Sequence, residues 1–511
     1  MSITLRPEPV TGEQDRPAGS ARPGDAIWVA VFATLFSAAG AARPSLWFDE
    51  AATISAATRP VPALWRMLGN IDAVHGLYYL AMHGWFTVFP ATEFWSRVSS
   101  SLTVGLAAAG VVVLGQQLST RSVAVSAGVV FALLPRVTWA GIETRSYALT
   151  MVTGVWLTVL VLVAMRRGRP QWWLVYSVLM LTATMLNVFS VLLLPVHAVM
   201  VAILAGSRRV RWHWTVSAVA VCAVAAPFLV FSQTQLYQIN WISPLGWRTV
   251  GMILQEQYFD HSVLVAVLSG LLVTAAALSW SRAGQRSRRL VTISLAWMAI
   301  PTVVLLAYSM LRHPIYYPRY LSFTTPAAAL FIGLCIVAVG RSRAGITILL
   351  TVFALAATPN YLAQRGPYAK EGMDYSQVAD VVTRYAAPGD CLVMDNSTTW
   401  KPGPIRPLLA ARPAAFAKLH DYGRGRSAIQ RNWLWDTHIA VWAWADKMPG
   451  CPAIWTVSER DPTLPDHEQG SALRPGPRLG RAMAYQVPSR FGFRVVERWQ
   501  FNFAQVVKSI R

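Results

Sequence analysis

Two adjacent carboxylates, Asp49 and Glu50, follow the first apolar stretch of the chain and are flanked by Trp47, Phe48 and Ala51. Carboxylates among apolar residues beside a membrane are costly to desolvate, and they usually mark a functional site or a paired structural charge. A carboxylate can accept the proton of a hydroxyl group, which makes Asp49 and Glu50 the candidate catalytic residues. In the alternative interpretation, Asp49 only caps a helix that starts near Glu50, a role that suits an aspartate.

Further charged and aromatic side chains occur in polar segments between apolar runs. The candidates for binding a substrate or a donor phosphate are His75, Arg97, Glu143, Arg145, Tyr147, His313, Arg319 and Tyr320. If these segments converge on one cavity, their cations suit an anionic leaving group such as a lipid phosphate, while a carboxylate activates a hydroxyl acceptor. The alternative for an arginine or a tyrosine is that it anchors the chain at the membrane interface. The four cysteines lack the spacing of a metal site, so no cofactor is expected, and a divalent metal stays open.

The composition predicts that membrane spans position these residues. Of the 511 residues, 54% are hydrophobic and only 14% are charged, against about 25% in a typical soluble domain. The net charge of +21 would favour a nucleic-acid partner in a soluble protein. Many arginines, however, cluster in short segments between apolar runs, which is typical of cytoplasmic loops. We therefore expect membrane lipid as the surroundings of the chain, and no nucleic acid as its partner.

Eleven apolar runs follow one another over residues 26–42, 99–115, 122–134, 148–165, 172–185, 188–206, 214–231, 262–280, 290–311, 321–340 and 346–357. They predict a polytopic α-helical membrane domain of about eleven spans over residues 26–360, after a disordered cytoplasmic tail over residues 1–25. The alternation of the basic segments places a large first outer loop, residues 43–98, on the extracytoplasmic side. Residues 76–89 of that loop are too short to span easily and are predicted to form a helix at the outer surface.

Residues 361–511 have a soluble composition and predict an extracytoplasmic α/β domain. Residues 375–386 have helical spacing, and residues 391–394 and 451–457 are strand candidates that follow turns rich in proline and glycine. Residues 493–503 are a candidate for a closing strand. Cys391 and Cys451 begin the two earlier strands, where an oxidising compartment permits a disulfide.

Several short motifs follow one another in order along the chain. They are Trp47-Phe48-Asp49-Glu50-Ala51, Leu77-Tyr78-Tyr79-Leu80, Glu93 with Arg97 and Ser99, Glu143-Thr144-Arg145-Ser146-Tyr147, Pro318-Arg319-Tyr320-Leu321 and, at the start of the soluble domain, Lys370, Asp374 and Pro388-Gly389-Asp390. This order resembles the GT-C superfamily of polyprenyl-phosphate-sugar-dependent glycosyltransferases, in the branch of protein mannosyltransferases, aminoarabinose transferases and related bacterial enzymes. One departure is His75-Gly76 before the tyrosine pair, where relatives often have Pro-Pro.

The resemblance implies an inverting glycosyltransferase in the plasma membrane with its active site on the extracytoplasmic face. The donor would be a polyprenyl-phosphate sugar, mannose or arabinose, and the acceptor a hydroxyl of an envelope glycolipid, polysaccharide or protein. Asp49 matches the acidic residue that acts on the acceptor hydroxyl, and Arg145, Arg319 and His313 are candidates for the donor phosphate.

The alternative function is a transporter or flippase of a lipid-linked saccharide. Such a protein should place ionisable residues near the middle of the membrane on broken helices. Here the apolar runs are nearly free of charge and the candidate site residues collect at one face, which favours the enzyme.

Overall fold

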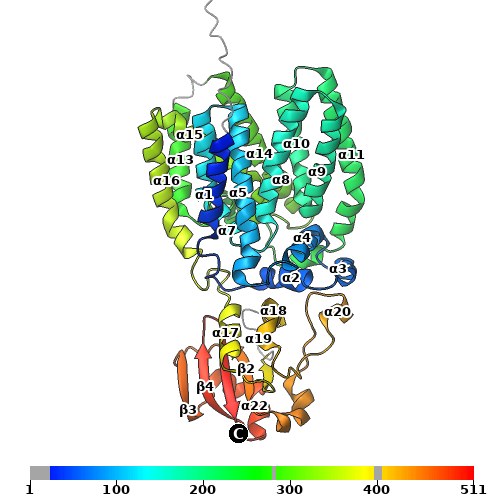
Figure 1. The fold of residues 1–511 in the computed structure, drawn as a ribbon, viewed down its shortest axis with the longest axis vertical. Helices are drawn as coiled ribbons and strands as arrows, with labels where there is room; N and C mark the ends of the chain where they lie inside the picture. The colour runs from blue at the N-terminus through cyan, green and yellow to red at the C-terminus, as the bar shows by residue number, and fades with distance from the viewer. Residues whose placement is uncertain (1–22, 279–283, 396–405) are drawn as a thin grey trace, which may run out of the picture.

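The computed structural model describes residues 23–278, 284–395 and 406–511, so most of the predicted N-terminal tail lies outside the described residues. The chain forms a bundle of long helices with a small α/β domain at one end of it (Figure 1). Each of the eleven apolar runs forms a helix. These helices are α1 (Pro23–Ala38), α5 (Glu93–Leu118), α6 (Arg121–Leu133), α8 (Tyr147–Arg167), α9 (Pro170–Leu186), α10 (Leu193–Leu204), α11 (Arg208–Gln233), α13 (Val263–Leu278), α14 (Gln285–Leu311), α15 (Thr325–Gly340) and α16 (Arg343–Ala363).

The predicted polytopic helical fold is confirmed. Among the described residues, six helical segments are long and apolar enough to cross a membrane, and several shorter apolar helices accompany them. The number of about eleven spans stays a prediction. Close packing in the bundle depends on small residues: a Cβ atom on Gly333 of α15 would lie 2.6 Å from the backbone nitrogen of Ala127 in α6, so only glycine fits there.

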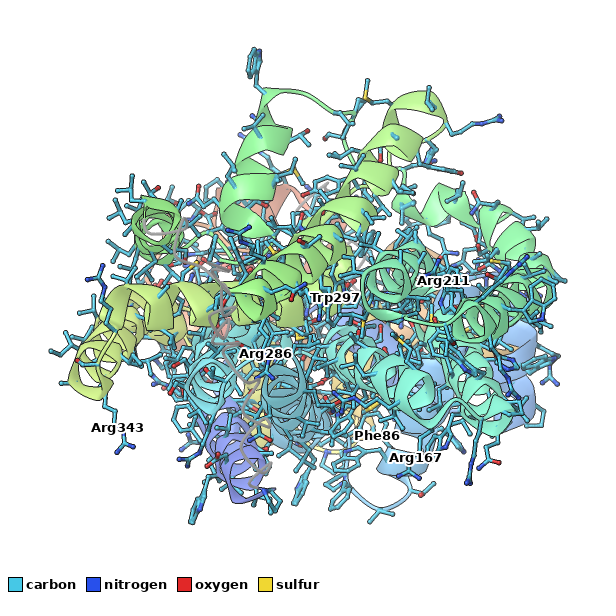
Figure 2. The ribbon with its side chains drawn as sticks, turned by 90° about the horizontal axis from the view of Figure 1, so that it is seen from above. Phe86, Arg167, Arg211, Arg286, Trp297 and Arg343 are labelled. Carbon is cyan, nitrogen blue, oxygen red and sulfur yellow. A yellow bond between two sulfur atoms is a disulfide. The ribbon has the colours of Figure 1, made fainter. Side chains whose placement is uncertain are left out.

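A layer of short helices separates the bundle from the α/β domain (Figure 1). It consists of α2 (Phe48–Ala57), α3 (Val61–Leu68), η1 (Ala73–His75) and α4 (Gly76–Phe86). The segment 76–89, predicted as a surface helix, is thus largely helical. Figure 2 looks onto the opposite end of the bundle, where the labelled basic residues are Arg167, Arg211, Arg286 and Arg343. The assignment of these two ends to the two sides of a membrane stays a prediction.

The α/β domain contains a five-stranded sheet in the order β1-β2-β5-β4-β3. The strands are β1 (Cys391–Met394), β2 (Ile454–Glu459), β3 (His467–Leu473), β4 (Arg494–Gln500) and β5 (Ala504–Ile510), accompanied by the helices α17 (Tyr375–Tyr385), α18 (Arg406–Ala411), α19 (Pro413–Phe416), α20 (Ala428–Arg431), α21 (Pro477–Arg481) and α22 (Met483–Arg490). Strands β1 and β2 are parallel, and the other neighbours are antiparallel.

The sheet confirms most of the predicted elements of this domain. The helix over residues 375–386 and the strand over residues 391–394 are present as α17 and β1, and β2 covers part of the second strand candidate. The strand candidate over residues 493–503 is present as β4, but its predicted role as the closing strand was wrong, because β4 is followed by β5, which lies between β2 and β4. Cys391 and Cys451 form the expected disulfide, with 5.6 Å between their Cα atoms, within the roughly 7 Å that a bridge allows.

The α/β domain is attached to the segment that leads into α2. The backbone nitrogen of Leu46 donates to Ser376 Oγ, and the backbone nitrogen of Ser376 donates to Ser45 Oγ, each over 3.0 Å. Glu93, the first residue of α5, accepts a hydrogen bond from Ser376 and pairs with Arg412 at 2.6 Å. The start of α17 is therefore fixed against the same stretch of chain that carries the two candidate carboxylates.

Candidate active site

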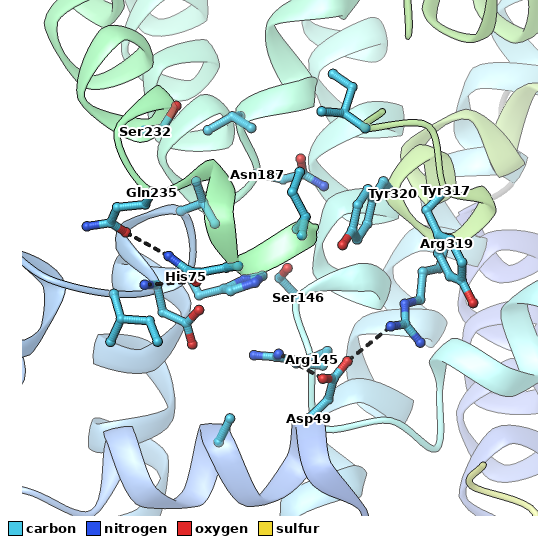
Figure 3. A pocket seen from close by; sticks show the side chains of 18 of the residues that line it. Asp49, His75, Arg145, Ser146, Asn187, Ser232, Gln235, Tyr317, Arg319 and Tyr320 are labelled. Carbon is cyan, nitrogen blue, oxygen red and sulfur yellow. Dashed lines mark hydrogen bonds and ion pairs between the residues drawn. The ribbon is translucent and has the colours of Figure 1, made fainter. Parts of the chain in front are cut away.

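Helix α2 positions Asp49 in its first turn. Trp47 is the N-terminal capping residue, and its side chain makes no capping hydrogen bond. Because the helix already starts at Phe48, Asp49 does not cap it, and the capping alternative was wrong. The side chain of Asp49 is 15% exposed and its two carboxylate oxygens lie 3.3 Å from Arg145 Nη2 and 3.4 Å from Arg319 Nη2 (Figure 3).

Glu50 has a different environment. Its carboxylate accepts hydrogen bonds from Arg97 Nε at 2.8 Å and from Arg97 Nη2 at 2.6 Å, and from the backbone nitrogen of Thr144 at 3.0 Å. Both side chains are completely buried. Arg97 also donates to three backbone carbonyls, those of Ala41, Pro44 and Ser45. The bidentate pair therefore uses the hydrogen-bonding capacity of both residues to fix the segment that leads into α2.

Glu143 lies in a second buried pair. One of its oxygens accepts from Trp47 Nε1 at 2.7 Å, and the other accepts from Lys370 Nζ at 2.5 Å. Burial raises the pKa of the Glu143 carboxyl above its usual value, and the neighbouring ammonium of Lys370 opposes that rise. Lys370 precedes α17, so Glu143 connects the indole of Trp47 to the chain leading into the α/β domain.

A cavity of about 730 Å³ lies beside Asp49. Six of the predicted site residues line it: Asp49, His75, Arg145, Tyr147, Arg319 and Tyr320. Four others, Glu50, Arg97, Glu143 and His313, are not among its described lining residues. The first three are held in the buried pairs behind the cavity. His313 lies in the segment that follows α14, between the lining residues Tyr308 and Ile315.

Arg319 is surrounded by aromatic rings. Its guanidinium carbon lies 4.8 to 6.0 Å from the ring centroids of Tyr317, Trp47, Trp241, Tyr147 and Trp139. Aromatic faces stabilise a cation without using its N–H groups. Among the described residues, the buried Nε of Arg319 has no hydrogen-bond partner, and the same holds for Nε of Arg145. Both guanidinium groups thus keep donor capacity beside the cavity.

The charges in the cavity follow from burial and from the two arginines. Burial opposes ionisation of Asp49, but Arg145 and Arg319 outweigh it, and the pKa of the carboxyl falls below its usual value. Burial, aided by Arg145, lowers the pKa of His75 to about 4. At neutral pH the cavity therefore contains an ionised carboxylate, two guanidinium groups and an uncharged imidazole whose buried Nδ1 has no partner among the described residues.

Several residues of the cavity region were not predicted as site residues. Tyr79 donates its hydroxyl to Asp72 at 2.6 Å and accepts a hydrogen bond from Arg145 at 2.9 Å. Tyr79 belongs to one of the recognised motifs, and Asp72 is a carboxylate of the same segment between α1 and α5, so the sequence offered a reason to consider both residues. Leu434 and Trp435 line the cavity from the α/β domain, and nothing in their sequence indicated it. Within the described ranges, no group of three or more His, Cys, Asp or Glu residues could hold a metal ion.

The comparisons with known proteins concern the fold. No model of a protein family matches the sequence, and no curated protein sequence matches it. The structure is similar to that of ArnT from Cupriavidus metallidurans in the apo state, with a TM-score of 0.58 and 12% identity over 96% of this chain and 98% of that chain. The apo oligosaccharyltransferase of Archaeoglobus fulgidus gives a TM-score of 0.48 at 12% identity, over 85% of this chain and 69% of that one. The protein thus has the fold of a polytopic helical membrane protein with a C-terminal α/β domain. That fold is shared with ArnT over nearly the whole chain.

Proposed function

We propose that this protein is an inverting glycosyltransferase that moves a sugar from a polyprenyl-phosphate donor to a hydroxyl group of an envelope glycolipid, polysaccharide or protein. The observation that carries the proposal is the ionised carboxylate of Asp49 at the cavity, between two guanidinium groups with unused donors. The ordered sequence motifs and the fold shared with ArnT support the same class of reaction.

In the proposed reaction, Asp49 accepts the proton of the acceptor hydroxyl while the hydroxyl oxygen attacks the anomeric carbon of the sugar. The bond from this carbon to the phosphate oxygen breaks, and its electron pair stays on the departing polyprenyl phosphate. Attack from the face opposite the leaving group inverts the anomeric configuration. Arg145 and Arg319 supply the positive charge that stabilises the phosphate as its negative charge develops.

Arg145 and Arg319 couple binding of the donor phosphate to the basicity of Asp49, because they contact the carboxylate and are proposed to bind the phosphate. Because Arg145 and Arg319 lower the pKa of Asp49, a phosphate that draws on their charge makes the carboxylate a stronger base. Donor binding would thus activate the base for the acceptor. Arginine suits the phosphate because its planar group donates several hydrogen bonds in a fixed geometry.

For the sugar, we propose mannose or arabinose. Both are uncharged and rich in hydroxyl groups, and the uncharged imidazole of His75 can exchange hydrogen bonds with such groups. Tyr147 and Tyr320 add aromatic surface to the same cavity, where the apolar face of a sugar ring can stack.

The test of the function uses purified full-length protein in lipid nanodiscs with polyprenyl-phosphate mannose or polyprenyl-phosphate arabinose, and an envelope extract as acceptor. We expect labelled sugar in the extract together with free polyprenyl phosphate. Mass spectrometry of envelope glycolipids from a deletion strain would then identify the acceptor. Movement of intact lipid-linked sugar across the bilayer, with no polyprenyl phosphate released, would instead support the transporter.

We also propose that the cavity and the α/β domain lie on the outer side of the plasma membrane. In a variant with Cys222 and Cys335 replaced by serine, an impermeant thiol reagent added to intact cells should label Gln430→Cys in the α/β domain and not Gln285→Cys at the start of α14. Both positions are exposed, so burial does not decide the outcome. The opposite labelling pattern would contradict the proposed sidedness.

A further inference from the structure

Behind Arg145 lies a chain of buried hydrogen bonds that the proposed reaction does not use directly. The hydroxyl of Tyr79 donates to Asp72 Oδ2 over 2.6 Å, and the Tyr79 hydroxyl oxygen accepts from Arg145 Nη1 over 2.9 Å. Tyr79 is completely buried and Asp72 is 8% exposed. Arg145 then reaches Asp49 through its other terminal nitrogen, at 3.3 Å. The chain Asp72–Tyr79–Arg145 therefore ends at the candidate base.

The direction of these hydrogen bonds is fixed by chemistry. A tyrosine hydroxyl has one proton to donate and lone pairs that can accept. Because the proton of Tyr79 is donated to Asp72 Oδ2, the Tyr79 oxygen is left to accept from Arg145. The donor of this second hydrogen bond is a charged guanidinium group, which makes the bond stronger than one between neutral partners.

Asp72 is itself held in an unusual conformation. Its φ of 60° lies in the left-handed region, which is uncommon for a residue other than glycine. Two glutamines that follow α11 hold the backbone here: Gln238 accepts from the Asp72 nitrogen over 3.2 Å, and Gln235 accepts from the Ala73 nitrogen over 2.9 Å. Such a conformation persists where the surroundings determine it, and it is frequent at functional sites.

We propose that Asp72 and Tyr79 are positioning residues that hold the guanidinium of Arg145 at the donor-phosphate site. The inference rests on the proposed function, because it assigns the phosphate to Arg145. It adds that the site depends on Tyr79, which is not among the described residues lining the cavity, on Asp72 at the cavity wall beside it, and on the glutamines that fix their loop. Without the Tyr79 oxygen, Arg145 would lose the hydrogen bond that sets its orientation and would have to be ordered when the phosphate binds.

The chain offers a matched control for this proposal. Tyr78 precedes Tyr79 in α4 and is also buried, at 4% exposure, but within the described residues no hydrogen bond joins its hydroxyl to Arg145. Tyr78→Phe and Tyr79→Phe remove the same atom from adjacent buried rings. Only Tyr79→Phe removes a contact to Arg145.

The experiment measures the affinity of the purified full-length variants for a polyprenyl monophosphate without sugar, and the KM for donor and acceptor separately. We expect Tyr79→Phe to weaken phosphate binding about tenfold, a size typical of coupling between contacting residues, and to raise the KM of the donor alone. Asp72→Asn should act in the same direction, and Tyr78→Phe should match the wild type. In an Arg145→Ala background, Tyr79→Phe should have no further effect.

Two outcomes would overturn the positioning role. One is equal phosphate affinity in Tyr79→Phe and Tyr78→Phe, and the other is a Tyr79→Phe effect that persists in full when Arg145 is already alanine. If Tyr79→Phe does not fold, Asp72→Asn provides the same comparison with and without Arg145. A wild-type protein that binds no polyprenyl phosphate would contradict the proposed function instead.

Discussion

Asp49 and Glu50 are neighbours in sequence, but their carboxylates have opposite surroundings. Glu50 is completely enclosed and accepts close hydrogen bonds from Arg97 and Thr144. Asp49 borders a cavity, and within the described part of the chain its carboxylate has two longer ion pairs, at 3.3 and 3.4 Å. Successive residues of a helix point about 100° apart, so adjacent carboxylates on α2 face different regions. The number and closeness of its partners therefore distinguish a carboxylate that stabilises the fold from one that is available for chemistry.

The arginines repeat this contrast. Arg97 donates to Glu50 and to three backbone carbonyls, so its hydrogen-bonding capacity serves the fold. Arg319 is positioned by aromatic rings instead, and its buried Nε has no partner among the described residues. Side chains of the same chemistry are therefore divided between a buried pair that holds the loop and a cavity that can receive a ligand.

The largest expected effect is that of Asp49→Asn. The amide has the same size but cannot accept the acceptor proton, so transfer should fall by about two to four orders of magnitude, the contribution typical of a general base. The protein should remain folded and inserted, and its unfolding temperature should fall less than that of Glu50→Gln, because the ion pairs of Asp49 are longer and less buried. A rate assay with saturating donor checks the prediction. Near-normal transfer by Asp49→Asn, beside a folded but inactive Glu50→Gln, would move the base to Glu50 and reverse the comparison.

Glu50→Gln should affect stability rather than chemistry. It leaves the fully buried guanidinium of Arg97 without a counter-ion, and breaking such a pair typically costs about 3–5 kcal/mol. We expect a markedly lower unfolding temperature and less monodisperse protein in detergent, with Asp49→Asn as the matched control. Equal unfolding temperatures for the two variants would show that the Glu50–Arg97 pair stabilises the fold no more than the ion pairs of Asp49 do.

Arg319→Lys tests whether the guanidinium group of Arg319, and not only its charge, binds the donor phosphate. Lysine keeps the charge but loses the planar group and its stacking on the rings, so the KM of the donor should rise about tenfold, as expected when a charged hydrogen bond is lost. Arg343→Lys, at the exposed start of α16, should leave the KM unchanged. A donor KM that is insensitive to Arg319→Lys would remove the residue from the phosphate site.

The smallest effect concerns pH. Burial lowers the pKa of His75 from its ordinary 6.5 to about 4, so between these values the unfolded chain binds a proton at His75 that the folded protein does not. The contribution of His75 to stability is thus present above pH 6.5 and is lost as the pH falls towards 4. His75→Asn should flatten the dependence of the unfolding temperature on pH in this window. An unchanged slope would mean that His75 is not held uncharged.

Much of the fold followed from local patterns. The apolar runs predicted helices because a chain in lipid must satisfy its backbone polar groups internally. The amphipathic spacing of α17 and the turn before β1 predicted those two elements, and the cysteines at the strand starts predicted the disulfide. Asp49 was recognised as a site candidate because a carboxylate beside apolar residues is costly without a role. Arg145 and Arg319 were recognised because cations of converging segments suit an anionic leaving group.

The remainder depended on contacts between distant segments. Glu50 and Arg97 are 47 positions apart, and nothing in either motif showed that they pair with each other and leave Asp49 to the cavity. The apolar pattern does not reveal sheet order, so the place of β5 between β2 and β4 was not foreseen. Trp435 is an ordinary aromatic residue in sequence, and only its packing against Phe48, with ring centroids 5.3 Å apart, brings it to the cavity.

That packing has a consequence for how the protein is made. The chain is synthesised from its N-terminus, so Asp49, Arg145 and Arg319 exist long before Leu434 and Trp435, the last residues to join the cavity wall. Before these two residues are in place, the part of the cavity wall that they form is missing. The wall is completed only when the α/β domain folds and docks, which makes the maturation of that domain the final step in building the site.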